Sequence, residues 1–283
     1  MNKTWRVKGQ ILSDAIFEQD VIIDNIQFNA FDGKTYIETV VNGDSTEEAR
    51  KVVLNKFEDV SSFLAFETDS KFKLIITDVI QIVSKGERGY GESDILGIMS
   101  IPRIITNQDI ENINKLIKMN SELDKITKAA LKYYERGIKI QEWNTESFIN
   151  YFKVIELLSN KYLDKAKQEQ EEENREKLDQ NIGKIIAEIK GGQYDRKIII
   201  KSAKEIYNIG KVGLRRRIEL AAIDLGVEGF TEEDIKKLVR TRNEVSAHAN
   251  SQSELIGDEE LKMCKSFAKK ILHGYIQKQI NEA

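Results

Sequence analysis

Residues 231–250 read TEEDIKKLVRTRNEVSAHAN, and their pattern predicts an amphipathic helix. Thr231 followed by Asp234 three residues later is a capping pattern, in which side chains bind the free backbone amides of a first helical turn. The apolar residues that follow recur at helical spacing. They are Ile235, Leu238, Val239 and Val245. One face of this helix should therefore pack into a core made of further helices.

Arg242 lies in the middle of this apolar stripe, seven residues after Ile235, since each residue of a helix turns by about 100°. An arginine on a buried face is costly unless it is paired or lines a wet cleft. A guanidinium also matches the bidentate geometry of a phosphate group. Arg242 is therefore a candidate anion-binding residue.

His248 lies six residues after Arg242, about 120° away around an ideal helix. Two side chains in that arrangement do not share a face. They would converge where the helix ends or distorts, or where a two-fold-related copy brings both motifs into one cleft. A purely local alternative is a pair between His248 and Glu244, which lies one turn earlier on the same face.

Helical periodicity extends from residue 106 onward and predicts an all-α domain over residues 106–283. Ser121 with Asp124 is expected to cap one helix, and Asn144 or Thr145 the next. The second of these carries an apolar stripe made of Phe148, Tyr151, Phe152, Ile155 and Tyr162. The highly charged segment 164–179 should form a solvated helix extension or a linker. After a break at Gly191-Gly192, we expect helices at 195–209, 211–225, 231–248 and 258–280.

The first 105 residues instead show strand patterns. Apolar and polar residues alternate through 26–30, Asp32-Gly33 is typical of a tight turn, and residues 35–41 are rich in β-branched side chains, so a hairpin is expected. Ser45 with Glu48 should cap a helix that runs to about Phe66.

Strand character returns at residues 72–83 and 95–105. The predicted fold class is therefore an α+β N-terminal domain over residues 1–105, followed by an all-α helical bundle over residues 106–283.

Neither of two glycine-containing stretches indicates a nucleotide site, and no cofactor is expected. Gly33-Lys34-Thr35 is similar to the end of a phosphate-binding loop, but Phe28 stands where that loop needs a glycine, so a hairpin turn is the better interpretation. A second group, Gly86, Gly89 and Gly91, has the reverse order of the dinucleotide fingerprint. A hairpin tip is expected there, with a recognition loop as the alternative.

Metal-ligating residues are scarce, because the chain has only His248, His273 and Cys264 among its histidines and cysteines. A four-ligand zinc site cannot be assembled from them, and no metal is expected, although a magnesium site made of carboxylates would leave little trace. His273 is expected near the end of the last helix, just before Gly274, where the helix dipole favours an imidazole.

The overall composition predicts a cytoplasmic protein without a membrane segment. No run approaches 18 consecutive apolar residues, and the N-terminal residues lack the apolar core of a secretory signal. A lone cysteine makes no internal disulfide. The net charge of −3 leaves room for a local basic patch. Lys211, Arg215, Arg216 and Arg217 share one predicted helix, radiate in different directions, and are candidates for contact with an RNA backbone, with simple solvation as the alternative.

At this point the sequence resembles a known family. Arg242-Asn243 followed by His248 is similar to the signature of HEPN domains, an arginine and a polar residue followed by a histidine after four to six intervening positions. Arg240 falls outside that spacing. The helical context, with YFKVIELL at 151–158 and GLRRRIELAAIDLG at 213–226, resembles the ApeA-like and MauJ-like branch. The resemblance covers residues 106–283.

The resemblance implies a helical bundle that is usually dimeric, with two motifs facing one cleft. Many members are metal-independent endoribonucleases of toxin–antitoxin or anti-phage systems, and others only bind. Arg242 would then stabilise the phosphate and His248 would exchange a proton with the ribose 2′-OH or the leaving 5′-oxygen. Asn243 would orient the phosphate or the imidazole. Asn250 stands where one branch has a tyrosine, which argues against antitoxin control through that residue.

Glu156 is a candidate supporting carboxylate, since Ile149, Phe152 and Ile155 border it on a largely apolar helix, and a surface position is the alternative. We therefore expect an endoribonuclease that leaves a 2′,3′-cyclic phosphate and a 5′-OH, acts on RNA as a homodimer, and has a possible antitoxin or sensor partner. A non-catalytic nucleotide-binding or RNA-binding module and a structural dimerisation domain are the alternatives.

Overall fold

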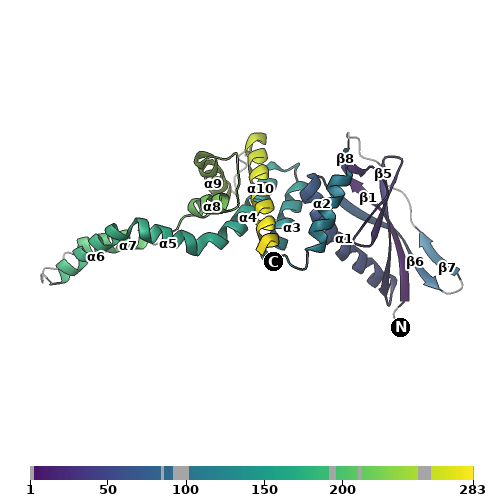
Figure 1. The fold of residues 1–283 in the computed structure, drawn as a ribbon, viewed down its shortest axis with the longest axis horizontal. Coiled ribbons are helices and arrows are strands. Elements are labelled where there is room, and N and C mark those ends of the chain that lie inside the picture. Colours follow the sequence, from purple (N-terminus) through teal and green to yellow (C-terminus); the bar gives the residue numbers. More distant parts are fainter. Residues whose placement is uncertain are drawn as a thin grey trace. The chain divides into compact units, whose positions relative to one another are not determined.

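A computed structural model describes residues 3–83, 86–91, 102–190, 196–209, 212–247 and 256–282. In these residues an antiparallel β-sheet region is followed by a series of helices, as the sequence predicts (Figure 1). The chain divides into two compact units, Met1–Tyr151 with Gln279–Ala283, and Phe152–Lys278.

The sheet of the first unit is built around β1 (Lys3–Ser13), which pairs antiparallel with both β5 (Lys34–Gly43) and β6 (Phe72–Val83). The remaining strands extend it on both sides, giving the order β3-β4-β5-β1-β6-β7. They are β3 (Val21–Ile23), β4 (Ile26–Phe31) and β7 (Gly86–Gly91). The three glycines expected at a hairpin tip lie within strand β7, where they pair with β6.

β1 is missing from the predicted elements, although its sequence carries the signal. Trp5, Val7 and Ile11 are buried at alternate positions of the strand. The register shifts between Lys8 and Gly9, where a Cβ would lie 2.7 Å from the carbonyl oxygen of Ile75. The glycine therefore allows a close backbone approach at an irregular point of the central strand.

The predicted hairpin is confirmed as β4 and β5, which join through Asp32 and Gly33. Both residues have positive φ, 50° and 68°, as a tight hairpin turn requires. Helix α1 (Thr46–Thr68) follows, two residues longer than expected. Ser45 caps it by accepting from the Glu48 amide at 3.2 Å, while the Glu48 carboxylate accepts from the Asp44 amide. One face of α1 packs on β1, β5 and β6.

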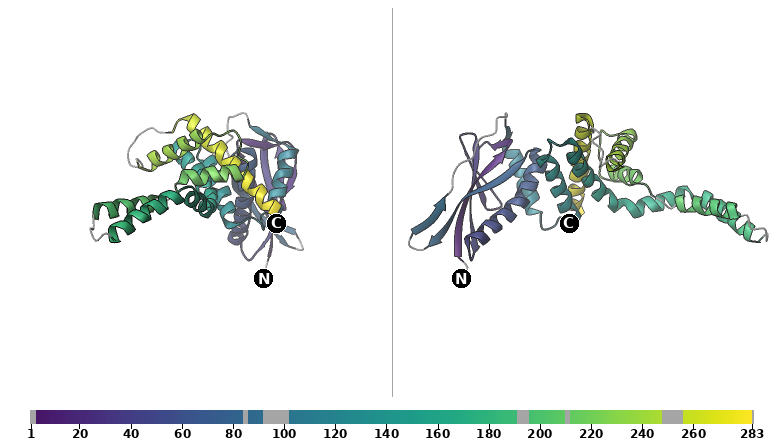
Figure 2. Two further views of the ribbon diagram at one scale, coloured as in Figure 1. Left: turned by 60° about the vertical axis from the view of Figure 1, so that its left-hand side comes forward. Right: turned by 180° about the vertical axis from the view of Figure 1, so that it is seen from behind.

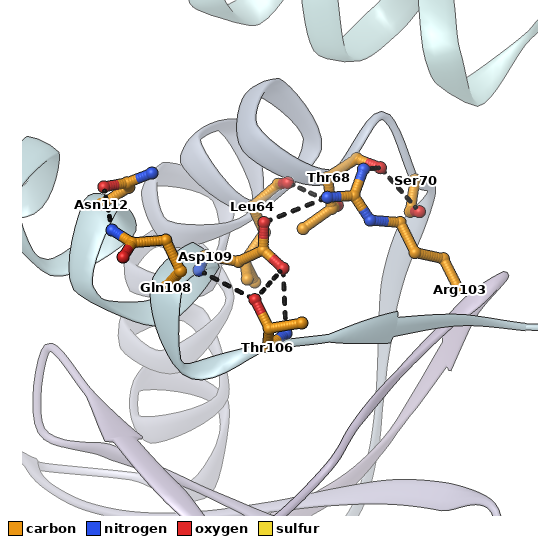
Figure 3. Close-up of polar contacts among 8 residues, drawn as sticks. All are labelled: Leu64, Thr68, Ser70, Arg103, Thr106, Gln108, Asp109 and Asn112. Atoms are coloured by element: carbon orange, nitrogen blue, oxygen red, sulfur yellow. Dashed lines mark hydrogen bonds and ion pairs between the residues drawn. The ribbon is translucent and has the colours of Figure 1, made fainter.

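The C-terminal end of α1 is held by Arg103 of β8 (Arg103–Ile105), a short strand that pairs in parallel with β2 (Ala15–Phe17) (Figure 3). The Arg103 guanidinium donates to the carbonyl oxygen of Thr68 at 2.5 Å and forms an ion pair with Asp109 at 3.0 Å. Asp109 also closes a capping box with Thr106. One arginine thereby joins the end of α1 to the beginning of the next helix.

Two helices, α2 (Asn107–Lys118) and α3 (Lys125–Lys139), pack against α1 in the first unit. The cap expected at Ser121 is wrong, because Asp124 is the N-cap of α3 and accepts from the Thr127 amide at 2.7 Å. Helix α4 (Asn144–Ser159) already includes Asn144 and Thr145, which were expected to cap it, so it begins slightly earlier than predicted. The five stripe residues are buried, and the last of them, Tyr162, lies just after α4. Strands give way to helices after residue 105, whereas the domain boundary placed there stays a prediction.

The second unit consists of helices. The 3-10 turn η1 (Asn160–Tyr162) leads from α4 into α5 (Leu163–Glu173), and α6 (Arg175–Lys190) and α7 (Arg196–Ile209) pack against each other. The charged segment 164–179 is therefore a helix extension. Three further helices confirm the predicted positions to within three residues: α8 (Leu214–Asp224), α9 (Glu232–Ala247) and α10 (Asp258–Glu282).

His273 is not near a helix end, which corrects its predicted role. α10 continues through Gly274 to Glu282, and His273 is an exposed residue in its interior. Gly274 does not stop the helix. A Cβ at this position would lie 2.6 Å from the carbonyl oxygen of Leu225, so the glycine allows α10 to approach the end of α8 closely.

Candidate functional site

Helix α9 presents Arg242 on the face that the sequence predicts. Thr231 and Asp234 form the expected capping box, with the Thr231 amide donating to the Asp234 carboxylate at 2.8 Å and the Asp234 amide donating to the Thr231 hydroxyl at 3.2 Å. The hydrogen bond from the Thr231 amide to the Asp234 carboxylate holds the pKa of Asp234 below its usual value. Ile235 and Leu238 are buried on the stripe, and the Arg242 side chain, one turn further along it, is 35% exposed.

The partner of Arg242 is Glu156 of α4, the carboxylate singled out in the sequence. Nη2 of Arg242 lies 2.7 Å from Oε1 of Glu156, whose side chain is only 16% exposed. The other carboxylate oxygen, Oε2, accepts from Lys153 at 3.0 Å. Glu156 is thus not an isolated surface residue, and it orients the guanidinium that the motif provides.

A second arginine pairs with the 3-10 turn η1, which directly follows α4. Arg217 of α8 donates through Nη1 to the side-chain oxygen of Asn160, which lies four residues after Glu156. Residues four apart on continuous helical backbone are neighbours, with Cβ atoms about 6 Å apart. Arg242 of α9 and Arg217 of α8 therefore pair with two residues that lie four apart in the chain, at the end of α4 and the start of η1.

We call these residues the α4 arginine cluster: Lys153, Glu156, Asn160, Arg217 and Arg242. It combines three cations with one carboxylate, so its net charge is positive. Nε of Arg217 is buried and has no hydrogen-bond partner in the described part of the chain. A buried guanidinium nitrogen without a partner is costly unless an acceptor meets it. The cluster is therefore suited to an anion with several oxygens, such as a phosphodiester.

The other two arginines of the predicted basic helix are directed elsewhere. Arg215 pairs with Glu219 at 2.5 Å and with Glu232 at 3.2 Å. Arg216 pairs with Glu169 at 3.0 Å and Glu173 at 3.4 Å. The three arginines do radiate in different directions, and carboxylates surround two of them. Lys211 lies outside the described residues, and the RNA contacts of this helix stay a prediction.

The remaining motif residues are only partly described. Asn243 is exposed, and its side-chain oxygen lies 3.3 Å from Nη1 of Arg242. His248 lies outside the described residues, directly after the last described turn of α9. The Glu244 carboxylate, considered above as a partner for His248, accepts from Arg240 at 2.8 Å.

Sequence reasoning did not identify Arg217 as a neighbour of Arg242. A signal was present, because Glu156 and Asn160 are polar residues four apart on a helix that is otherwise rich in large apolar side chains. Such a pair predicts a polar strip on α4. The residues that pair with the strip come from α8 and α9, and their packing is a tertiary property.

Among the described residues, no three or more histidine, cysteine, aspartate or glutamate side chains gather where they could hold a metal ion. No helix in the described ranges combines the length and the apolar character needed to cross a membrane.

Comparisons of the chain with protein-family models, with curated proteins and with solved structures give no significant match.

Proposed function

We propose that this protein is a metal-independent endoribonuclease of the HEPN type, and that it acts as a toxin or an anti-phage effector. The observation that supports this best is the α4 arginine cluster, in which Arg242 of the motif pairs with Glu156 of α4 and Arg217 pairs with Asn160 of the turn that follows. Guanidinium groups suit the charged oxygens of a phosphodiester. His248 follows Arg242 by six residues and supplies a group that titrates near neutral pH.

The chemistry assigned to these residues is attack of the ribose 2′-oxygen on the neighbouring phosphorus. A bond forms between the 2′-oxygen and phosphorus while the bond from phosphorus to the 5′-oxygen breaks. The 2′-OH proton is released and the 5′-oxygen gains one, and His248 carries out one of these two transfers. Arg242 stabilises the charge that develops on the phosphoryl oxygens, and Glu156 fixes its orientation. The products carry a 2′,3′-cyclic phosphate and a 5′-OH.

The partners that follow from this proposal are RNA and a second copy of the chain. A homodimer would let two motifs share one cleft. This arrangement is favoured because Arg242 and His248 lie about 120° apart around an ideal helix and do not share a face. An antitoxin or sensor partner would control the activity. None of these steps uses a metal ion, and the reaction should therefore continue in EDTA.

The test compares wild-type protein with Arg242→Ala and His248→Ala on total RNA or tRNA in EDTA. Both substitutions should lower the cleavage rate by at least 100-fold, about the effect of removing one transition-state donor or a general acid–base group. Arg240→Ala is the matched control, because Arg240 lies on the same helix, is 80% exposed, and pairs with Glu244 away from the cluster. If cleavage survives Arg242→Ala or His248→Ala, the assignment is contradicted.

A structural role for Arg242 is the second candidate, and the same ion pair favours it. A guanidinium already held by a carboxylate can serve packing between α4 and α9 alone. Because Arg242 is more than a third exposed, our proposal expects Arg242→Ala to lower the free energy of unfolding by about 1 kcal/mol or less. A loss of more than about 3 kcal/mol with unchanged RNA binding, measured by urea unfolding and by titration with labelled RNA, would favour the structural role.

A further inference from the structure

Helices α6 and α7 pack against each other as a hairpin (Figure 2). The residues at their contact form a seam along both helices. On α6 the less exposed residues recur at alternating spacings of four and three, the spacing of a coiled-coil seam. They are Leu178, Asn181, Ile185 and Glu188, and Asn174, directly before α6, continues the same spacing. On α7 the corresponding residues are Ile199, Ser202 and Ile206, and Asn181 and Ser202 are buried.

A second set of apolar residues lies beside this seam. On each helix it occupies the position that directly follows a seam residue. In an antiparallel pair of helices, positions directly after the seam lie on the same side of both helices. We call this surface the α6–α7 apolar face: Ile182, Ile186 and Ile189 of α6, with Ile200, Ala203 and Tyr207 of α7.

The side chains of this face are in contact with water. Its isoleucines and Tyr207 are between 40% and 65% exposed. A helix normally buries its apolar face against another element, and a contiguous apolar surface with a polar border is typical of an interaction site. Ile198, which is similarly exposed, lies on the opposite side of the seam and does not belong to the face.

Charges divide along the length of the hairpin. At the end near α5, Glu176 and Asp179 border the apolar face on α6. At the far end, Lys190 of α6 and Arg196 of α7 border it. Arg175 also directly follows a seam residue at the α5 end, so that end carries one cation and two carboxylates, whereas both residues named at the far end are cations. The far end is therefore basic and the end near α5 is weakly acidic. An identical face turned end for end would place each basic end against an acidic end.

We propose that the α6–α7 apolar face binds the same face of a second copy, with the two hairpins antiparallel, to form a four-helix bundle. A two-fold axis between Ile185 and Ile186 brings the isoleucines of both copies into register. Lys190 lies 4.5 residues and Asp179 6.5 residues from this axis along α6. Lys190 of one copy is therefore offset by about 3 Å from Asp179 of the other, which is within the reach of a lysine side chain. A single symmetric arrangement therefore buries the apolar face and brings the basic end of each copy to the acidic end of the other.

The size of the face sets the strength of this interaction. About 16 residues of each helix span about 24 Å, and two helices side by side are about 20 Å wide. A flat contact of these dimensions buries on the order of 1,000 Å² in total, near the lower end of specific interfaces. The dimer should therefore dissociate on dilution in the micromolar range rather than be permanent.

This inference does not depend on the ribonuclease proposal, since no residue of the α4 arginine cluster takes part. The test is sedimentation velocity of the full chain over a range of concentrations. Ile186→Lys should raise the dissociation constant of the dimer at least tenfold, whereas Ile198→Lys, on the other side of the seam, should leave it unchanged. Circular dichroism at the same concentrations monitors helix content in both variants.

A charge exchange identifies the antiparallel arrangement. Lys190→Glu and Asp179→Lys should each weaken the dimer, because each places like charges opposite one another, and the double variant should restore it. A monomer at all concentrations, or an equal effect of Ile186→Lys and Ile198→Lys, would overturn the proposal. So would single charge variants that bind as tightly as wild type, even where a dimer forms through another surface.

Discussion

At the scale of single residues, Asp224 is a carboxylate whose ionisation stabilises the fold. It lies at the end of α8 and accepts from Lys278 at 2.6 Å and from Tyr162 at 2.7 Å. The hydrogen bond from Lys278 and then that from Tyr162 hold the pKa of this carboxyl below its usual value. A lowered pKa in the folded state means that the ionised form stabilises the protein above the unfolded pKa of about 3.9. This stabilisation is lost as the pH falls through the folded pKa.

Asp224→Asn should therefore lower the free energy of unfolding at pH 7, and the difference from wild type should shrink as the pH falls below about 4. Urea unfolding at pH 7, 5 and 3.5 measures both effects. Asp164→Asn is the control, because that side chain is 95% exposed and its ion pair with Lys167 spans 3.7 Å. A constant difference between Asp224→Asn and wild type over this pH range would contradict the assignment.

Individual residues of the candidate site were predictable to different degrees. The position of Arg242 follows from the spacing of Ile235 and Leu238, since the period of one helix fixes its own buried face. Arg242 and Glu156 are 86 residues apart in the sequence, and their pairing depends on how their two helices pack. No local pattern encodes that contact, and the same is true of Arg217 and Asn160.

At the scale of helices and strands, two glycines in helix interiors have different surroundings. Gly274 of α10 faces the carbonyl oxygen of Leu225, 2.6 Å from the position of a Cβ, while Gly183 of α6 has nothing within 4 Å of that position. Alanine favours a helix over glycine by about 1 kcal/mol at both sites. Only at Gly274 must the backbone of a neighbouring segment move to accommodate the methyl group.

Gly183→Ala should therefore raise the free energy of unfolding by about 0.5–1 kcal/mol, and Gly274→Ala should lower it by about 1–3 kcal/mol. Both values come from one series of chemical denaturation curves. The comparison uses the same substitution in helices of the same unit, so equal effects at the two positions would show that α10 does not depend on close approach to the end of α8.

Elements were predicted best where a local signal is strong. Positive φ at Asp32 and Gly33 accompanies a two-residue turn that these residue types already favour, since aspartate tolerates the left-handed region and glycine has no Cβ. β1 was missed because glycine at its bulge and interspersed basic residues weaken an alternation that is present at Trp5, Val7 and Ile11. Its partners, β5 and β6, begin more than 20 residues later in the chain. Pairing with them decides its central place in the sheet.

At the scale of the whole molecule, the two compact units contain different elements, and both proposals concern residues of the second unit. The first contains the sheet with α1 packed on one face, and the second contains the α4 arginine cluster and the α6–α7 apolar face. The net charge of −3 indicates no affinity for RNA on its own. Any RNA binding must therefore come from local groups of cations, and it should weaken as salt concentration rises.

The central claim, that the cluster around Arg242 acts with His248 to cleave RNA, is tested most directly by the chemistry of the product ends. A defined RNA is incubated with purified wild-type protein in EDTA, and the fragments are analysed by mass spectrometry. We predict fragments with a 2′,3′-cyclic phosphate and a 5′-OH, present with wild type and Arg240→Ala but absent with Arg242→Ala. Intact RNA with the wild-type protein, or fragments with 5′-phosphate ends, would contradict the claim.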